Sequence, residues 1–112
     1  MMKPSSWEIW DANVAFEDDP HTLKRRPVLV ISPKDIFILS LKITSHEPRK
    51  MYPGEYQIKK WREAGLNKPS TVRCSKRLNL IESDFIKKRG KLQVIDMIEV
   101  RNILHEIKSK KL

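Results

Sequence analysis

The stretch RRPVLVIS, residues 25–32, joins two arginines to a short, uninterrupted apolar run. A continuous apolar run of this length is typical of a β-strand that is covered on both faces. Pro27 restricts Arg26 to an extended backbone conformation, so the Arg26 side chain leaves the rim of a sheet in a defined direction. The stretch therefore predicts a buried central strand with a cation mounted at its beginning.

The segments on either side of this stretch have the patterns of further strands. Residues 10–16 alternate apolar and polar side chains, and residues 36–44 are rich in β-branched and aromatic side chains. Residues 71–81 repeat an apolar residue at alternate positions, and residues 55–58 form a shorter candidate. Turn-forming residues separate most of these segments. The sequence thus predicts an antiparallel, mainly β fold over its first eighty residues.

The C-terminal part of the chain changes to a helical pattern. Ser83 can cap a short helix that continues through Arg89, with Gly90 as its left-handed stop. Asp96 and Glu99 resemble the capping box of a second helix, and apolar residues follow at helical spacing. Strands followed by helices predict an α+β fold, mainly β, with a small barrel or curled sheet closed by the C-terminal helix.

The length and composition exclude several classes of protein. The 112 residues fit a single domain, residues 1–112, and the one cysteine, Cys74, allows neither an intrachain disulfide nor a cysteine-based metal cluster. The N-terminus lacks the apolar core of a signal peptide, and no apolar run is long enough for a membrane span. We therefore expect a cytoplasmic protein that needs no membrane, metal or cofactor.

The charge is unevenly distributed. The chain has 23 Lys and Arg against 14 Asp and Glu, a net charge of +9. Residues 1–56 are balanced, with eight basic and eight acidic side chains, so residues 57–112 carry the whole excess. A basic surplus of this kind favours a polyanionic partner such as nucleic acid. Lysines that only keep the protein soluble would give the same composition.

Two polar clusters adjoin the predicted strands. The first is Lys24-Arg25-Arg26, in which a guanidinium could hold two phosphate oxygens at once, although a solvated turn would look the same. The second is residues 44–46, Thr-Ser-His, directly after an apolar strand. Hydroxyls and an imidazole can exchange protons or bind phosphate oxygens, but they are also common turn residues.

A third cluster lies in the predicted strand 71–81. Arg73, Ser75 and Arg77 alternate along it, with Lys76 between them. Alternate residues share one face of a strand, so these side chains could form a basic stripe along a phosphate backbone. Cations on a strand edge also protect a sheet against aggregation, so both interpretations stay open.

Four motifs occur in an order that resembles a known family. They are WEIWDANVAF (7–16), RRPVLVIS (25–32), ITS (43–45) and VRC (72–74), and the similarity extends from about residue 7 to residue 104. The sequence resembles the PemK/MazF family, the mRNA-cleaving toxins of type II toxin–antitoxin modules. This resemblance implies an SH3-like β-barrel with a C-terminal helix, a homodimer, and a metal-independent endoribonuclease. The implied partners are single-stranded RNA and a cognate antitoxin.

The resemblance also implies a mechanism and a set of residues. In such enzymes the 2′-hydroxyl attacks the adjacent phosphodiester and leaves a 2′,3′-cyclic phosphate and a 5′-hydroxyl. The principal arginine of the family falls on Arg26, its hydroxyl residue on Thr44, and the arginine that acts as general acid on Arg73. The polar neighbours of these residues are the expected RNA-binding set: Lys24, Arg25, Ser45, His46, Ser75, Lys76, Arg77 and His21.

The sequence departs from the family pattern at Ser75. Members with a VRCD-type strand carry an aspartate there, two positions after the arginine. If that aspartate is the general base, another group must take the proton of the 2′-hydroxyl: Glu17, Asp18, Asp19 or His46. Two alternatives therefore stay open: a barrel that binds RNA without cleaving it, and a toxin of this fold that acts on a protein such as gyrase.

Overall fold

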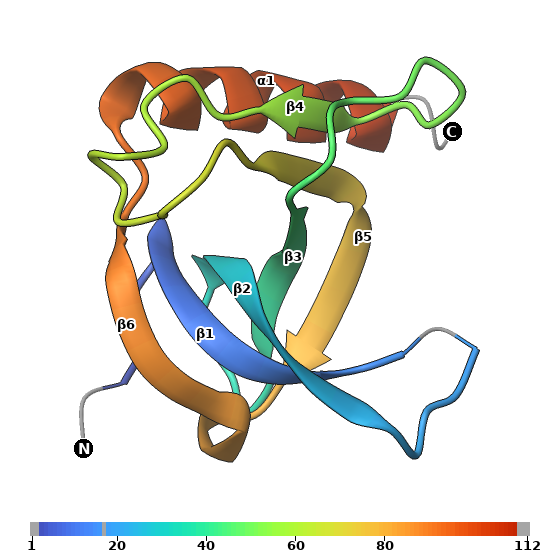
Figure 1. Ribbon diagram of the computed structural model, residues 1–112, viewed down its shortest axis with the longest axis vertical. Helices are drawn as coiled ribbons and strands as arrows, with labels where there is room; N and C mark the ends of the chain where they lie inside the picture. Colours follow the sequence, from blue (N-terminus) through green and yellow to red (C-terminus); the bar gives the residue numbers. More distant parts are fainter. Residues whose placement is uncertain (1–2, 17, 110–112) are drawn as a thin grey trace.

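The computed structural model describes residues 3–16 and 18–109. Within these residues, six strands form one antiparallel sheet in the order β4-β5-β3-β2-β1-β6, and one α-helix follows the last strand (Figure 1). The elements are β1 (Glu8–Ala15), β2 (Leu23–Ser32), β3 (Ile38–Thr44), β4 (Glu55–Gln57), β5 (Thr71–Leu80), the 3-10 turn η1 (Glu82–Asp84), β6 (Phe85–Lys91) and α1 (Val94–Ser109). This order confirms the predicted fold class, mainly β with a C-terminal helix.

The sheet curves strongly but does not close into the expected barrel (Figure 1). The edge strands β4 and β6 are not paired with each other. The core next to α1 contains buried side chains from outside the strands, including Ile58, Leu66, Leu92 and Val100. Side-chain packing from the connecting segments and the helix therefore takes the place of strand pairing between the edges.

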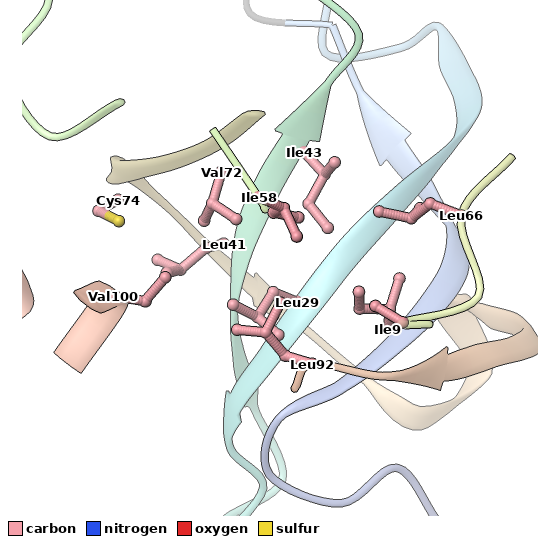
Figure 2. Close-up of a cluster of buried hydrophobic side chains, with 11 residues drawn as sticks. Ile9, Leu29, Leu41, Ile43, Ile58, Leu66, Val72, Cys74, Leu92 and Val100 are labelled. Atoms are coloured by element: carbon pink, nitrogen blue, oxygen red, sulfur yellow. The ribbon is translucent and has the colours of Figure 1, made fainter. Parts of the chain in front are cut away.

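Buried side chains cover both faces of the central strand β2. Leu29 belongs to a cluster that includes Leu41 and Val100 (Figure 2), whereas Val28 and Val30 belong to a second cluster. All three β2 residues have no exposed surface, which confirms that the apolar run of RRPVLVIS is covered on both sides. The cations before this run are thus mounted on a strand whose apolar part is fully buried.

Residues 85–91 form strand β6, so the helix predicted from Ser83 through Arg89 was wrong. The segment pairs antiparallel with β1. Gly90 lies within this strand, where a Cβ atom would stand 2.2 Å from the carbonyl oxygen of Ala64. Pairing with a distant strand and this close backbone approach override the local pattern, which could not reveal either.

Helix α1 begins at Val94, and the predicted first residue, Asp96, has another role. Asp96 is fully buried, and its carboxylate accepts hydrogen bonds from the Tyr56 hydroxyl (2.5 Å) and from the backbone N–H groups of Lys59 and Lys60 (2.9 Å each). Burial and the neighbouring Asp96 carboxylate raise the pKa of Tyr56. Asp96 therefore anchors the segment after β4 to the helix.

Strand β5 contains an irregularity that bends it. Leu41 of β3 pairs with Arg77, whereas the next residue, Lys42, pairs with Arg73, so the register between β3 and β5 shifts between these two pairs. Simple alternation along the strand therefore fails at this point. The basic stripe that the sequence suggested is interrupted, because Arg73 and Arg77 lie on opposite sides of the bulge.

Candidate active site

A cleft of about 400 Å³ opens beside the beginning of β2 and the end of β3. Five cations and one carboxylate line it, so its charge suits a polyanion. The full lining is Asp11, Lys24, Arg25, Arg26, Pro27, Ile43, Thr44, Ser45, Leu66, Asn67, Lys68, Ser70 and Arg89. Segments that are distant in the sequence therefore meet at one cationic surface.

Arg26 and Thr44, two of the three residues predicted to be catalytic, both line this cleft. Arg26 lies in β2 opposite Ala12, and Thr44 is the last residue of β3. The Thr44 hydroxyl oxygen is buried and has no hydrogen-bond partner, and no other buried side-chain oxygen or nitrogen among the described residues shares this state. A hydroxyl left in this way costs about 1–3 kcal/mol, and such groups are rare in folded proteins.

Asp11 organises two of the cations in the cleft. Its carboxylate is almost fully buried and accepts hydrogen bonds from Arg25 Nη2 (3.1 Å) and from Arg89 Nη1 (3.3 Å). Arg89 Nε also donates to the carbonyl oxygen of Gly65 (3.2 Å). Arg25 and Arg89 are thus held in place by a neutralising partner, and the cleft keeps a positive excess.

The sequence analysis missed Asp11 and Arg89, together with the cleft residues Asn67, Lys68 and Ser70. Asp11 occupied a polar position in an alternating strand, where a solvated carboxylate is the usual interpretation. Arg89 fell in the helix that the structure replaces with β6.

Arg73 lies next to the cleft without lining it. The register pairs Thr44 with Thr71, and Arg73 follows two positions later on the same face of β5. Strand spacing and rise put the Cα atoms of Arg73 and Thr44 roughly 8–9 Å apart. The Arg73 side chain is mostly buried, and its Nε donates to Glu55 Oε2 (3.1 Å).

Glu55 holds a second arginine. Arg49 donates to the Glu55 carboxylate from its backbone N–H (2.9 Å) and from Nη2 (2.8 Å). The side-chain hydrogen bond with Arg49 outweighs the effect of burial and lowers the pKa of Glu55 to about 2, with Arg73 adding to the shift. Glu55 is therefore ionised at neutral pH and binds both guanidinium groups.

The remaining predicted RNA-binding residues divide into two groups. Lys24, Arg25 and Ser45 line the cleft with Arg26 and Thr44, and Lys24 Nζ also lies over the Phe16 ring (5.9 Å to the centroid). The second group lies outside the cleft. In it, the Ser75 hydroxyl donates to the carbonyl oxygen of Pro53 (3.2 Å) and Lys76 is half-buried. The other members of this group are exposed: Arg77, His21 and His46.

Among the described residues, the predicted proton acceptors Asp18, Asp19 and His46 do not line the cleft. The Asp19 carboxylate accepts hydrogen bonds from the Thr22 hydroxyl (2.5 Å) and from the backbone of His21 (3.2 Å), and Asp18 is exposed. Glu17 lies outside the described residues. His46 follows Thr44 by two positions, and its Nδ1 atom lies 3.2 Å from the carbonyl oxygen of Glu47.

Two further features of the described residues bear on the site. Within residues 3–16 and 18–109, no three His, Cys, Asp or Glu side chains lie close enough together to hold a metal ion. None of the helices formed by these residues has the length and apolar character that crossing a bilayer requires.

Comparison with known proteins identifies the family. Residues 5–107 match the family described as PemK-like, MazF-like toxins of type II toxin–antitoxin systems. Among curated proteins, none is similar enough in sequence to count as a relative.

Solved structures share the fold at low sequence identity. The MazF of Deinococcus radiodurans is 20% identical with a TM-score of 0.72, covering 97% of this chain and 99% of its own. The Mycobacterium tuberculosis toxin MazF-mt6 is 21% identical with a TM-score of 0.69, covering 88% and 93%. A mycobacterial endoribonuclease in complex with its cognate antitoxin is 11% identical with a TM-score of 0.71, covering 90% of each chain. With nearly its whole length matched, the chain belongs to the family of PemK-like, MazF-like toxins of type II toxin–antitoxin systems.

Proposed function

We propose that this toxin is a sequence-selective, metal-independent endoribonuclease that cleaves single-stranded mRNA. The observation that carries the proposal is the meeting of Arg26 with the unpartnered hydroxyl of Thr44 in one cationic cleft. Two structures of the same fold, each described as a mycobacterial endoribonuclease, add support. The proposed function is thus the activity that the resemblance of the sequence implies.

The reaction is a transesterification within the RNA. The 2′-oxygen forms a bond to the adjacent phosphorus, the bond from phosphorus to the 5′-oxygen breaks, and a 2′,3′-cyclic phosphate and a 5′-hydroxyl result. Arg26 neutralises the extra negative charge of the pentacovalent phosphorane, and Thr44 donates a hydrogen bond to a non-bridging oxygen. A preorganised donor of this kind contributes about 10²–10³ to a rate.

Two proton transfers accompany this displacement. We assign His46 as the acceptor of the 2′-hydroxyl proton, because its imidazole is exposed and it follows Thr44 by two positions in the sequence. An arginine side chain is not deprotonated in proteins, so we assign to Arg73 the binding of a neighbouring phosphate instead of the general acid role. Water then supplies the proton that the leaving 5′-oxygen takes up.

The other cations of the cleft hold the RNA backbone. Lys24, Arg25, Lys68 and Arg89 each offer donors to phosphate oxygens, with Ser45 beside them. Each phosphate neutralised on a single strand contributes about −0.7 to the slope of log affinity against log salt. RNA binding should therefore weaken steeply as the salt concentration rises.

The same cleft offers a natural target for inhibition. Complexes of toxin and antitoxin are among the structures that share the fold, including MazE–MazF of Deinococcus radiodurans. We propose that an acidic segment of a cognate antitoxin covers the cationic cleft and excludes RNA, because complementary charge speeds association. We further propose that residues 1–112 act as one domain that functions as a homodimer.

The test is incubation of the purified protein with a long unstructured RNA in excess EDTA, beside an Arg26→Ala variant. Fragments with 2′,3′-cyclic phosphate ends, absent with the variant, are the expected result. RNA that is bound but left intact would contradict the nuclease proposal and favour a binding module. RNA that is neither cut nor bound would contradict both and favour a protein target.

A further inference from the structure

The loop of residues 45–54 connects the cleft to a second cluster of side chains, formed by Arg49, Tyr52, Glu55 and Arg73. It leaves β3 after Thr44, inside the cleft, and enters β4 at Glu55. Strand β5 holds the loop at both ends, because the Thr71 hydroxyl donates to the carbonyl oxygen of His46 (2.6 Å) and the backbone N–H of Cys74 donates to that of Gly54 (2.8 Å). The second cluster is therefore fixed relative to the cleft.

Tyr52 is the aromatic residue of this cluster. The Arg49 guanidinium lies over its ring, with Cζ 4.0 Å from the centroid, and Arg73 Cζ lies 6.0 Å from the same centroid. The backbone N–H of Tyr52 donates to the carbonyl oxygen of Arg49 (3.1 Å), which fixes the turn that carries both residues. Although Arg49 covers part of the ring, 42% of the Tyr52 surface is exposed.

The charge of the cluster is positive. Glu55 is ionised, since its pKa is about 2, so the two guanidinium groups and the carboxylate that they share have a formal charge of +1 together. Its carboxylate also restrains Arg49, which would otherwise be a flexible surface side chain. An ordered aromatic ring beside surplus positive charge is the combination with which proteins bind unpaired bases and their phosphates.

We propose that Tyr52 stacks on a base of single-stranded RNA next to the phosphate bound at Arg26 and Thr44, with Arg49 and Arg73 contributing the positive charge at this subsite. The proposal rests on the proposed nuclease function and deepens it by locating a base-binding position. Arg73 lies on the same face as Thr44, roughly 8–9 Å away, so one RNA strand can occupy both places.

Two probes separate base stacking from charge. The first is a fluorescein-labelled 2′-O-methyl RNA of about 12 nucleotides with mixed sequence, which lacks the attacking hydroxyl and is not cleaved. The second is an abasic oligonucleotide of the same length and charge. Fluorescence anisotropy measures the affinity of each probe for the wild-type chain and its variants.

Tyr52→Ala should weaken binding of the RNA probe at least about tenfold, the range expected for one stacked base, and change binding of the abasic probe less than twofold. Tyr52→Phe and Tyr52→Trp should keep the wild-type affinity. Phe37→Ala is the control and should have no effect, because Phe37 is an exposed aromatic that directly precedes β3, at the end opposite to Thr44.

Other results would overturn the proposal. Equal loss on both probes would mean that Tyr52 acts through structure or charge, and wild-type affinity in Tyr52→Ala would mean that it does not touch RNA. In either case RNA cleavage by the wild-type chain leaves the nuclease proposal standing. A wild-type chain that neither binds nor cuts RNA overturns both. Loss of antitoxin binding alone in Tyr52→Ala would assign this face to a protein partner.

Discussion

Thr44 and Thr71 lie directly opposite each other in β3 and β5, yet only one of the two hydroxyls has a hydrogen-bond partner. The Thr71 hydroxyl donates to the carbonyl oxygen of His46 (2.6 Å), and this bond holds the loop after β3. The Thr44 hydroxyl is buried at the cleft without a partner. Two identical side chains in register therefore have different roles, one structural and one available to a ligand.

Thr44→Val should lower cleavage without lowering stability. The change keeps the shape of the side chain and removes a hydroxyl that is buried without a partner, so the free energy of unfolding should stay unchanged or rise by up to about 1 kcal/mol. The rate of RNA cleavage should fall about 10²-fold, because a donor to the phosphorane is lost. Urea unfolding and single-turnover cleavage measure the two effects.

Thr71→Val provides the matched control. Losing its hydrogen bond should cost about 1–2 kcal/mol of stability, because the carbonyl oxygen of His46 is left without this donor. If Thr44→Val lost as much stability as Thr71→Val, the Thr44 hydroxyl would have a structural partner after all, and its assignment to the phosphate would be wrong.

Glu55 should make the stability of the protein depend on acid pH. Its folded-state pKa, about 2, lies below the ordinary value of 4.5, so its contribution is complete above about pH 4.5 and is lost as the pH falls toward 2. Glu55→Gln should lower the free energy of unfolding by about 1–3 kcal/mol at pH 7, and the difference from wild type should shrink between pH 4.5 and 2.

Unfolding by urea at several pH values measures this difference. Glu47→Gln, which changes an exposed carboxylate in the neighbouring loop, should track the wild type at each pH. A difference between wild type and Glu55→Gln that stayed constant down to pH 2 would show that the pair with Arg49 and Arg73 does not lower the pKa.

Asp11→Asn should separate RNA binding from catalysis. The change weakens the hydrogen bonds that hold Arg25 and Arg89 and raises the charge of the cleft by one unit. We therefore expect unchanged or tighter RNA binding, because attraction to phosphates increases, with a cleavage rate about tenfold lower, because the cations are less well positioned. The affinity for the uncleavable RNA tests the expectation for binding, and the single-turnover cleavage rate tests the expectation for catalysis. A parallel loss in both would point to unfolding of the cleft.

Gly90→Ala tests the assignment of residues 85–91 to a strand. An alanine Cβ would stand 2.2 Å from the Ala64 carbonyl oxygen, so the turn before β5 must move away from β6. We expect a loss of at least about 2 kcal/mol in the free energy of unfolding, as in other overpacked sites. Lys91→Ala, at an exposed neighbouring position, should change stability by less than about 0.5 kcal/mol. Equal stability of the two variants in thermal unfolding would contradict the close approach of Gly90 to the Ala64 carbonyl oxygen.

The sequence by itself determined the buried central strand. The apolar run of RRPVLVIS predicted burial on both faces, and Val28, Leu29 and Val30 are fully buried. This prediction succeeded because the local pattern of apolar side chains indicates which faces of a strand are buried. The resemblance of the motifs to the PemK/MazF family added the residues Arg26 and Thr44, which line one cleft in the structure.

Only the tertiary structure decided which distant groups meet. The β6 segment is a strand because β1 offers it hydrogen bonds, and Asp11 is a buried anchor because Arg25 and Arg89 converge on it. Pairing of β4 with β5 places Arg73 opposite Glu55, 18 positions earlier in the chain, and Arg73 Nε donates to its carboxylate. Strand pairing and ion pairing join residues that are far apart in the sequence, so no local pattern of polarity can report them.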